Sequence, residues 1–327
     1  MQQVEAPVLF ITFNRPESTR VVFEAIRQAK PKKLYISSDG PRPKKYEDDQ
    51  SKISEVRKLA GEVDWDCAVK TRFLEENLGC GPGVSSAITW AFQEEEKLII
   101  IEDDCIPSLS FFSFCNELLN RYADNERIMH ISGTRWNEEY PIHDCDYFFT
   151  KYDHIWGWAT WKRAWDLYDF KVTDYPLFKE KKILNIALNN SASIIRNWTA
   201  ILDDIYQRKV KHTWDYQWQY CIFKYNGLCI NTVKNLVTNI GTEGVHDSKE
   251  TYMHNRTRFE TKGQLKAPAF LYPEYGWEEY HAKHFFLKGS GSLKLLYYYL
   301  SAKIPYLNRL HPKLSALKRR FTGYQHA

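Results

Sequence analysis

Three consecutive acids, Glu102, Asp103 and Asp104, directly follow the most apolar run of the chain, Leu98–Ile101. Like charges repel, and a buried strand seldom ends in three carboxylates unless a cation compensates the repulsion. Carboxylate oxygens suit Mg²⁺ or Mn²⁺, which proteins hold through one or two carboxylates together with substrate phosphates. The triplet therefore predicts a Mn²⁺ or Mg²⁺ site that a nucleotide diphosphate completes. An acidic turn that caps the helix starting near Ser108 is the alternative.

A fourth carboxylate with a suggestive setting is Asp215, which lies between Trp214 and Tyr216 and shortly before Trp218. A general base must lie within hydrogen-bond reach of the group that it deprotonates, and apolar walls raise its pKa. The aromatic neighbours can form such walls, so Asp215 is a candidate general base. Asp also favours the start of a helix, where it caps backbone N–H groups, and that role stays open.

Two other segments have spacings that chemistry uses. Asn77–Gly83 is rich in glycine before a predicted helix, where backbone N–H groups can hold phosphate. It lacks the G-x-x-x-x-G-K-[ST] pattern of a P-loop, so it predicts a turn that leaves room for a nucleotide. His281 and His284 have the spacing of metal ligands, and we interpret them as structural.

Alternating strands and helices over residues 1–135 must position these side chains. The apolar and β-branched runs predict strands at Val8–Phe13, Leu34–Ser37, Ala68–Phe73, Leu98–Ile101 and Ile128–Ser132. Helical patterns lie between them, and Asn14 followed by Glu17 predicts a capping box for the first helix. The alternation predicts an α/β, Rossmann-like fold with a mostly parallel sheet flanked by helices.

Ligands of such sheets bind beyond the carboxyl ends of the strands. The polar residues predicted at those ends are Asn14, Arg15, Asp39, Arg42 and the acidic triplet. They come from separate strands, so we expect them to converge on one edge of the sheet.

The second half of the chain has a different pattern. From about Asp144 to His246 strand-like and helix-like segments no longer alternate regularly, and the segments are rich in aromatic residues. We interpret this part as the side of the domain that binds a second substrate, the acceptor. The predicted organisation is one domain over residues 1–280, with a nucleotide-binding half (1–135) and an acceptor half (136–280). A basic amphipathic helical tail (281–327) follows. Its run Leu293–Leu300 suits either an anionic membrane surface or packing on the body.

Several short motifs occur in an order that resembles a known family. They are Val8–Pro16, Ser37–Gly40, Ile99–Asp104, Ile131–Asn137, Ile155–Trp161, Trp214–Trp218 and Gly244–Ser248. In this order they resemble the GT-A nucleotide-diphospho-sugar transferases. The likeness is to the Golgi N-acetylglucosaminyltransferases that act on N-glycans and O-mannosyl glycans, and to similar bacterial proteins. It covers roughly residues 8–248.

The resemblance implies a role for each matching position. Asp104 would ligate the metal, with His246 either a second ligand or a surface histidine, and Asp215 would be the general base. The donor would contact Asn14, Arg15, Asp39, Glu102, Asp103, Arg135 and Trp158. His246 and Asp247 depart from the family, which has a small polar residue there.

The implied activity is transfer of a sugar from a nucleotide-diphosphate donor, with a uridine nucleotide favoured, onto a glycan or lipid-linked acceptor hydroxyl. Inversion at the anomeric carbon and a place in bacterial surface polysaccharide synthesis also follow from the resemblance. A sugar-phosphate nucleotidylyltransferase is one alternative, although Phe13–Pro16 lacks the glycine-rich loop usual there. A non-catalytic carbohydrate-binding protein is another, although it would not need the acidic triplet.

Composition narrows these classes further. The net charge of +4 is modest, which argues against nucleic acid as a partner. Aromatic residues make up 15% of the chain, and their rings suit the C–H faces of sugars. The 7 cysteines are odd in number without a C-x-x-C pair, so a reducing cytoplasm is expected. No apolar run approaches the roughly 18 residues of a membrane span, and peripheral contact with the inner membrane face would involve the tail.

Overall fold

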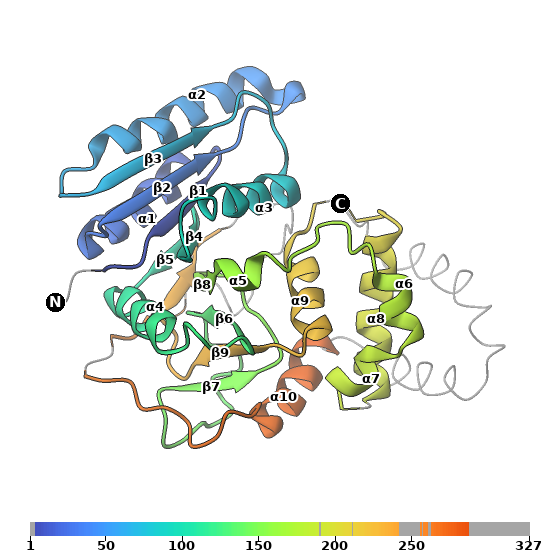
Figure 1. The fold of residues 1–327 in the computed structure, drawn as a ribbon. Coiled ribbons are helices and arrows are strands. Elements are labelled where there is room, and N and C mark those ends of the chain that lie inside the picture. Colours follow the sequence, from blue (N-terminus) through green and yellow to red (C-terminus); the bar gives the residue numbers. More distant parts are fainter. Residues whose placement is uncertain are drawn as a thin grey trace.

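The computed structural model describes residues 4–189, 191–210, 212–241, 256, 258–260 and 263–287. Its centre is an eight-stranded sheet in the order β3-β2-β1-β4-β8-β6-β9-β7, and a two-stranded sheet pairs β10 with β5. Figure 1 shows helices on both faces of the large sheet. The strands are β1 (Val8–Thr12), β2 (Lys33–Ser38), β3 (Ala68–Phe73), β4 (Lys97–Glu102), β5 (Cys105–Pro107), β6 (Ile128–Ser132), β7 (Tyr147–Thr150), β8 (Trp158–Trp161), β9 (Leu228–Thr232) and β10 (Val237–Asn239).

The predicted α/β class is confirmed, and the sheet is parallel where the alternation predicted it. Strands β3, β2, β1 and β4 pair in parallel. The sheet becomes mixed in the second half, because β8 is antiparallel to both β4 and β6, and β7 is antiparallel to β9. The aromatic-rich segments therefore extend the same sheet and do not build a separate one.

The helices fill the connections between strands. They are α1 (Pro16–Ala29), α2 (Tyr46–Lys58), α3 (Cys80–Ala91), α4 (Leu109–Arg121), α5 (Lys162–Trp165), α6 (Tyr175–Glu180), α7 (Ile183–Ala187), α8 (Ala192–Tyr206), α9 (Asp215–Lys224) and α10 (Tyr275–His281), with shorter turns η1 (Pro43–Lys45), η2 (Leu59–Glu62) and η3 (Ala282–Phe286). In Figure 1, α6, α7 and α8 lie together beyond α9.

Alternate residues of the strands point into two different core layers, as the pleat requires. Phe10 and Ile99 pack in a cluster with residues of α1 and α4. Leu9 and Ile100 face the other way, into a cluster with residues of α3 and α9. A third cluster, which includes Trp198, joins α6, α7 and α8 to α10. Apart from the outermost strand β3, the sheet is thus buried on both faces, which leaves the strand ends for ligands.

The predicted capping box at α1 is wrong. Arg15 occupies the cap position without a side-chain cap hydrogen bond, and Pro16 opens the helix. The Asn14 side chain turns away, and its Nδ2 donates to Asp49 Oδ1 at 2.7 Å. Asp49 is fully buried, and a buried carboxylate must be hydrogen-bonded. Satisfying that carboxylate therefore takes priority over capping.

The predicted boundary between residues 280 and 281 runs through continuous helical structure. His281 ends α10, and η3 follows at once. The His281 ring is fully buried and stacks on Trp277 at 4.5 Å, which supports its interpretation as structural. Residues 281–287 therefore belong to the body, while the rest of the predicted tail lies outside the described residues. In the described ranges, every helix is too short or too polar to cross a membrane.

Candidate functional site

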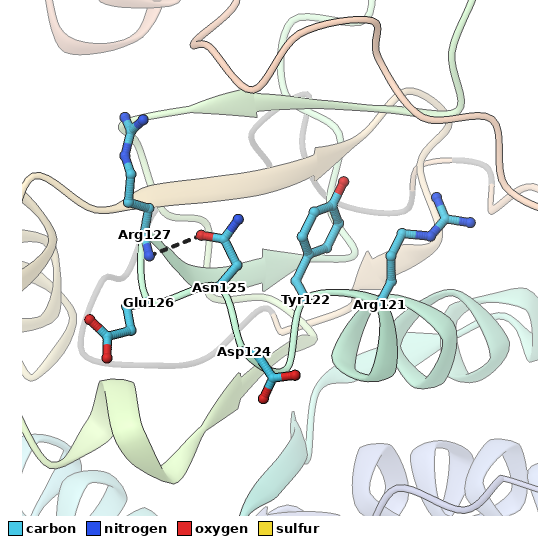
Figure 2. Close-up of a pocket in the computed structure, with 6 residues that line it drawn as sticks. All are labelled: Arg121, Tyr122, Asp124, Asn125, Glu126 and Arg127. Carbon is cyan, nitrogen blue, oxygen red and sulfur yellow. Dashed lines mark hydrogen bonds between the residues drawn. The ribbon is translucent and has the colours of Figure 1, made fainter.

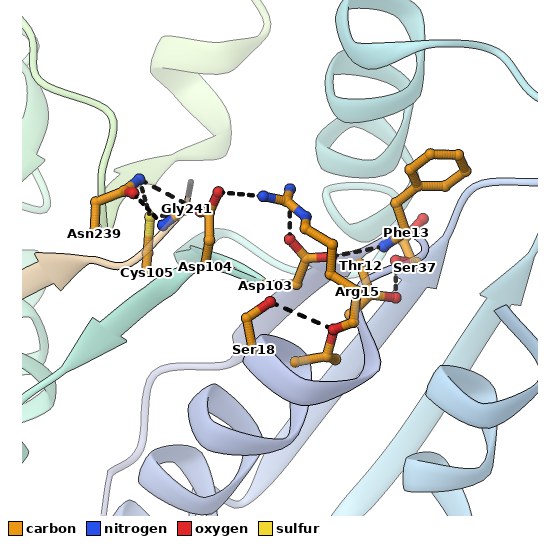
Figure 3. A network of polar contacts seen from close by, with 11 residues as sticks. Thr12, Phe13, Arg15, Ser18, Ser37, Asp103, Asp104, Cys105, Asn239 and Gly241 are labelled. Atoms are coloured by element: carbon orange, nitrogen blue, oxygen red, sulfur yellow. Dashed lines mark hydrogen bonds and ion pairs between the residues drawn. The ribbon is translucent and has the colours of Figure 1, made fainter. Parts of the chain in front are cut away.

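Arg15 joins two acids of the triplet (Figure 3). Its Nη1 lies 2.5 Å from Asp104 Oδ2, and its Nη2 lies 2.7 Å from Asp103 Oδ1. The backbone N–H of Phe13 donates to the other oxygen of Asp103 at 2.9 Å. A cation and a backbone N–H thus compensate part of the negative charge at the end of β4.

This contact follows from the strand register. β1 and β4 pair in parallel, with Ile11 opposite Glu102. The residues that leave β1 and those that leave β4 therefore emerge side by side at one edge of the sheet. The predicted convergence is confirmed for Arg15, Asp103 and Asp104.

The triplet carries more negative charge than Arg15 neutralises. Burial, then the charges of Asp104 and Asp103, raise the pKa of Glu102 to about 8. Burial also raises the pKa of Asp103 to about 6, although Arg15 opposes that shift. Burial lowers the pKa of Arg15, but Asp103 and Asp104 more than offset it and hold the guanidinium charged. A further cation at this edge would therefore be stabilised by the surrounding charge.

Residues near the end of β10, which no sequence motif indicated, complete the surroundings of Asp104. Asn239 Nδ2 lies 3.5 Å from Asp104 Oδ1, and the N–H of Ile240 donates to the Asp104 carbonyl at 2.8 Å. A Cβ on Gly241 would lie only 2.5 Å from Asp104 Oδ2. Because glycine lacks that atom, the backbone can approach the carboxylate closely.

The donor set fits a hard divalent cation. Asp104 and its acidic neighbours supply carboxylate oxygens, and Mg²⁺ or Mn²⁺ needs only one or two of these when phosphates and water fill the remaining positions. Within the described ranges, no three His, Cys, Asp or Glu side chains are grouped so that they alone could hold a metal. The protein ligands would thus be few. His246, the predicted second ligand, lies outside those ranges.

Asp39 lies at the same edge, but its carboxylate is already engaged. It accepts from the N–H groups of Gly40, Leu78 and Gly79 and from Asn77 Nδ2, at 2.9–3.0 Å. Burial raises its pKa, while these backbone N–H groups oppose the shift. Asp39 therefore anchors the glycine-rich turn before α3, and any nucleoside contact would use a carboxylate held rigidly by that turn.

Asn14 and Arg42, both predicted at this edge, share one buried partner. Arg42 Nε and Nη2 each donate to Asp49 at 2.7 Å, and Asn14 binds the same carboxylate. Hydrogen bonds from Arg42, then others, outweigh burial and hold the pKa of Asp49 well below its usual range. Asp49, which the sequence did not single out, therefore ties the loops after β1 and β2 together.

Asp215 is the first residue of α9, directly after the cap residue Trp214. The pKa of Glu102 is raised mainly by burial and by the charges of Asp104 and Asp103, and the charge of Asp215 adds to this rise. Asp215 therefore lies within electrostatic reach of the triplet. Burial, then the charge of Asp215, raise the pKa of Asp153 well above its usual value. Asp153 Oδ2 is buried without a hydrogen-bond partner. The structure thus brings a second carboxyl group within electrostatic reach of the candidate base.

Two residues that were predicted to contact the donor are buried. Trp158 is fully buried, because it belongs to a central strand; its ring stacks on those of His130 and Trp214 at 5.0 and 5.5 Å. Arg135 is 1% exposed, and its guanidinium donates to backbone carbonyls, including that of Tyr140 at 2.7 Å. Both side chains are packed inside the protein, and neither presents a surface to a donor. Trp158 supports Trp214, which precedes the candidate base.

A separate hollow lies at the turn between α4 and β6 (Figure 2). Its lining includes Arg121, Glu126 and Arg127, and Asn125 Oδ1 accepts from the N–H of Arg127 at 3.1 Å. β6 and β4 are both antiparallel to β8, so they run in the same direction. This hollow is at the amino end of β6, whereas the triplet follows the carboxyl end of β4. The two sites therefore lie at opposite ends of the strands.

Comparisons with known proteins add little. No family model and no curated protein match the chain. Among solved structures, S. aureus TarS 1-349 is similar over 48% of this chain and 47% of that one (TM-score 0.33, 11% identity). A longer S. aureus TarS structure is similar over 55% of this chain and 30% of that one (TM-score 0.33, 12% identity). HddC from Yersinia pseudotuberculosis is similar over 38% of this chain and 56% of that one (TM-score 0.25, 16% identity). This chain thus covers less than half of either TarS structure. These likenesses carry no argument about function, which rests on the site geometry.

Proposed function

We propose that the chain is a metal-dependent glycosyltransferase that moves a sugar from a nucleotide-diphosphate donor onto a hydroxyl of a glycan or lipid-linked acceptor. One observation carries the proposal: the acids that end β4 meet Arg15 from the end of β1, with Asp215 in electrostatic reach. Opposite charges at a strand-end edge of an α/β sheet suit a diphosphate and its cation.

The donor side uses the triplet and Arg15. Asp104 would hold Mn²⁺ or Mg²⁺, with Glu102 and Asp103 beside it. The cation, when bound, supplies positive charge that stabilises the departing diphosphate. Arg15 brings a second positive charge to the same place. A uridine nucleotide is the donor that we favour, on the motif resemblance alone.

The acceptor side uses Asp215 as the general base. Its carboxylate would remove the proton of the attacking hydroxyl, and the fully buried rings of Trp214 and Trp218 exclude water behind it. A single displacement of this kind inverts the anomeric carbon. Synthesis of a bacterial surface polysaccharide, at the inner membrane face, is the setting that we propose.

The test measures sugar release and transfer from a panel of nucleotide sugars, with Mn²⁺ or with EDTA. We expect turnover of at least one uridine-diphosphate sugar that depends on the metal and is lost in Asp104→Asn. Asp124 lines the hollow at the opposite ends of the strands, and Asp124→Asn, the matched change there, should retain turnover. Pyrophosphate-dependent release of a sugar phosphate would instead indicate a nucleotidylyltransferase. Binding of saccharides without any turnover would indicate a carbohydrate-binding protein.

A further inference from the structure

A groove of about 570 Å³ lies between α3 and the segment that follows α5. None of its lining residues is used in the proposed reaction. The lining combines three aromatic rings with polar side chains, and its principal members are Arg72, Ser86, Trp90, Gln93, Tyr168 and Phe170.

The aromatic walls of the groove are held in place from behind. The Trp90 ring meets Tyr35 edge-on at 5.3 Å, and Tyr168 stacks on Trp165 at 4.2 Å. Trp165 is fixed in turn, because its Nε1 donates to Thr89 Oγ1 at 3.0 Å. Rigid aromatic rings beside hydroxyl and amide groups suit a sugar, whose C–H faces are apolar and whose rim forms hydrogen bonds.

Arg72 is the charged side chain in this lining. Its Nη1 and Nη2 donate to Ser37 Oγ and Ser86 Oγ at 3.2 and 3.0 Å. Among the described residues, no carboxylate lies within ion-pair distance of it. Burial lowers its pKa, and the charge of Asp39 only partly opposes this. An anionic ligand would supply the counter-charge that the half-buried guanidinium lacks, since guanidinium pairs well with carboxylate and phosphate.

The groove adjoins the proposed catalytic edge. Tyr168 Oη donates to the carbonyl of Trp214 at 3.1 Å, and Asp215 is the next residue. At the other side, burial and then the charges of Glu102 and Asp215 raise the pKa of the Cys80 thiol to about 12, so the start of α3 lies within electrostatic reach of the triplet. Ser86 and Trp90 follow roughly 9–15 Å along that helix, a span that a short oligosaccharide covers.

We propose that this groove is an acceptor subsite for an acidic saccharide, one that bears a carboxylate or phosphate group. The aromatic rings would hold the sugar and Arg72 its anionic group, away from the hydroxyl that reacts. The position of the subsite within an acceptor rests on the proposed function, whereas binding of the saccharide does not.

The experiment titrates hexagalacturonate, maltohexaose and inorganic phosphate into the whole chain by calorimetry, without nucleotide. We expect hexagalacturonate to bind at least about tenfold more tightly than maltohexaose, and inorganic phosphate to bind more weakly than either. Arg72→Gln should remove that preference and leave maltohexaose unchanged. Arg163→Gln is the matched control: like Arg72, Arg163 is a half-buried arginine that donates to uncharged oxygens, here two backbone carbonyls, but it lies outside the groove.

Phe170→Ala keeps the test decisive if Arg72→Gln does not fold, because it should weaken both hexasaccharides and spare the fold. Equal affinity for the two hexasaccharides, or an unchanged preference in Arg72→Gln, would overturn the proposal. Phosphate that binds as tightly as hexagalacturonate would also overturn it. Mn²⁺-dependent binding of uridine diphosphate, measured in parallel, separates the two ideas: its absence in wild type refutes the proposed function and leaves the saccharide result standing.

Discussion

Arg15 reaches from the loop after β1 to Asp104 after β4, with Nη1 and Oδ2 2.5 Å apart. The chain thus supplies its own cation at the position where a divalent cation is proposed. A metal at Asp104 would share the carboxylate with this guanidinium or displace it. The strength of the pair therefore bears on both metal affinity and the stability of the protein without metal.

Replacing Asp104 by Ala should abolish Mn²⁺-dependent binding of uridine diphosphate while the protein stays folded. Asp104 supplies the carboxylate that we assign to the metal, and a loss of at least about tenfold in affinity is expected. Calorimetry with and without Mn²⁺ measures it. A folded Asp104→Ala protein with wild-type, metal-dependent affinity would contradict the assignment.

Replacing Arg15 by Met should destabilise the protein in the absence of metal. The substitution leaves Asp103 and Asp104 without their counter-charge, and breaking a buried pair costs about 3–5 kcal/mol. Arg15 is 30% exposed, so about 1–3 kcal/mol is the realistic loss. Mn²⁺ should restore part of it, because it replaces the missing charge. Urea unfolding with and without Mn²⁺ measures both effects. Arg20→Met, which removes an exposed pair with Glu62, serves as control.

Stability should fall as the pH rises through the neutral range, and Glu102 should be a cause. Its pKa is raised to about 8 against about 4.3 in the unfolded chain, so the folded state binds the extra proton. The stability that protonated Glu102 contributes is fully present below about pH 4 and is lost as the pH rises to 8, by at most about 1.4 kcal/mol per pH unit. Urea unfolding between pH 5 and 8 should show a shallower slope for Glu102→Gln than for wild type. Parallel slopes would exclude Glu102 as the group responsible.

The fold was predictable from the sequence where strand and helix patterns were strong. The strands β1 to β4 were each predicted within one or two residues. Burial on both faces explains the apolar runs of β1, β2 and β4, whereas β3 lies at the end of the strand order and is mostly exposed. The convergence of Arg15 with Asp103 and Asp104 followed from the same topology. Periodicity also gave the α/β class, although it could not show that β8 runs antiparallel between β4 and β6.

The parts that the sequence could not predict depend on long-range packing. Nothing local distinguishes Trp158, which is buried, from a ring that lines a pocket. Asp49 lies in a charged, exposed-looking helix, yet it is fully buried because Asn14 and Arg42 from two other segments pair with it. Asn239 and Gly241 approach Asp104 only because β10 pairs with β5, a contact between residues more than 130 positions apart.

Lowering the pH should destabilise the protein through His130, whereas lowering the pH stabilises it through Glu102. Trp218 Nε1 donates to His130 Nδ1 at 3.2 Å, so the ring is the Nε2–H tautomer, which donates to the His154 carbonyl at 3.1 Å. Burial lowers the pKa of His130 to about 3. The stability that the neutral His130 ring contributes is therefore fully present above pH 6.5 and is lost as the pH falls toward 3. His130→Gln should be less stable at pH 7 and lose less stability between pH 6.5 and 4.5. An equal loss in both proteins would rule the group out.

Asp215 is predicted to be the general base, and its neighbour Asp153 offers a matched comparison. Both are half-buried carboxyl groups, but burial and then the charge of Asp215 raise the pKa of Asp153 well above its usual value, which favours its protonated form and makes it the poorer proton acceptor of the two. Asp215→Asn should therefore reduce kcat, and Asp153→Asn should leave kcat within a small factor of wild type.

The size of the effect follows from the role. A base acts in the transition state, so Asp215→Asn should reduce kcat by about 10²–10⁴-fold and leave the donor Kd nearly unchanged. Asparagine keeps the shape of the side chain, and the stack of Trp158 on Trp214 should preserve the start of α9. Steady-state kinetics with the identified acceptor and donor titrations measure the two quantities. A large loss of kcat in Asp153→Asn with near-normal kcat in Asp215→Asn would transfer the role to Asp153. A loss of donor affinity equal to the loss of kcat/KM would make Asp215 a binding residue.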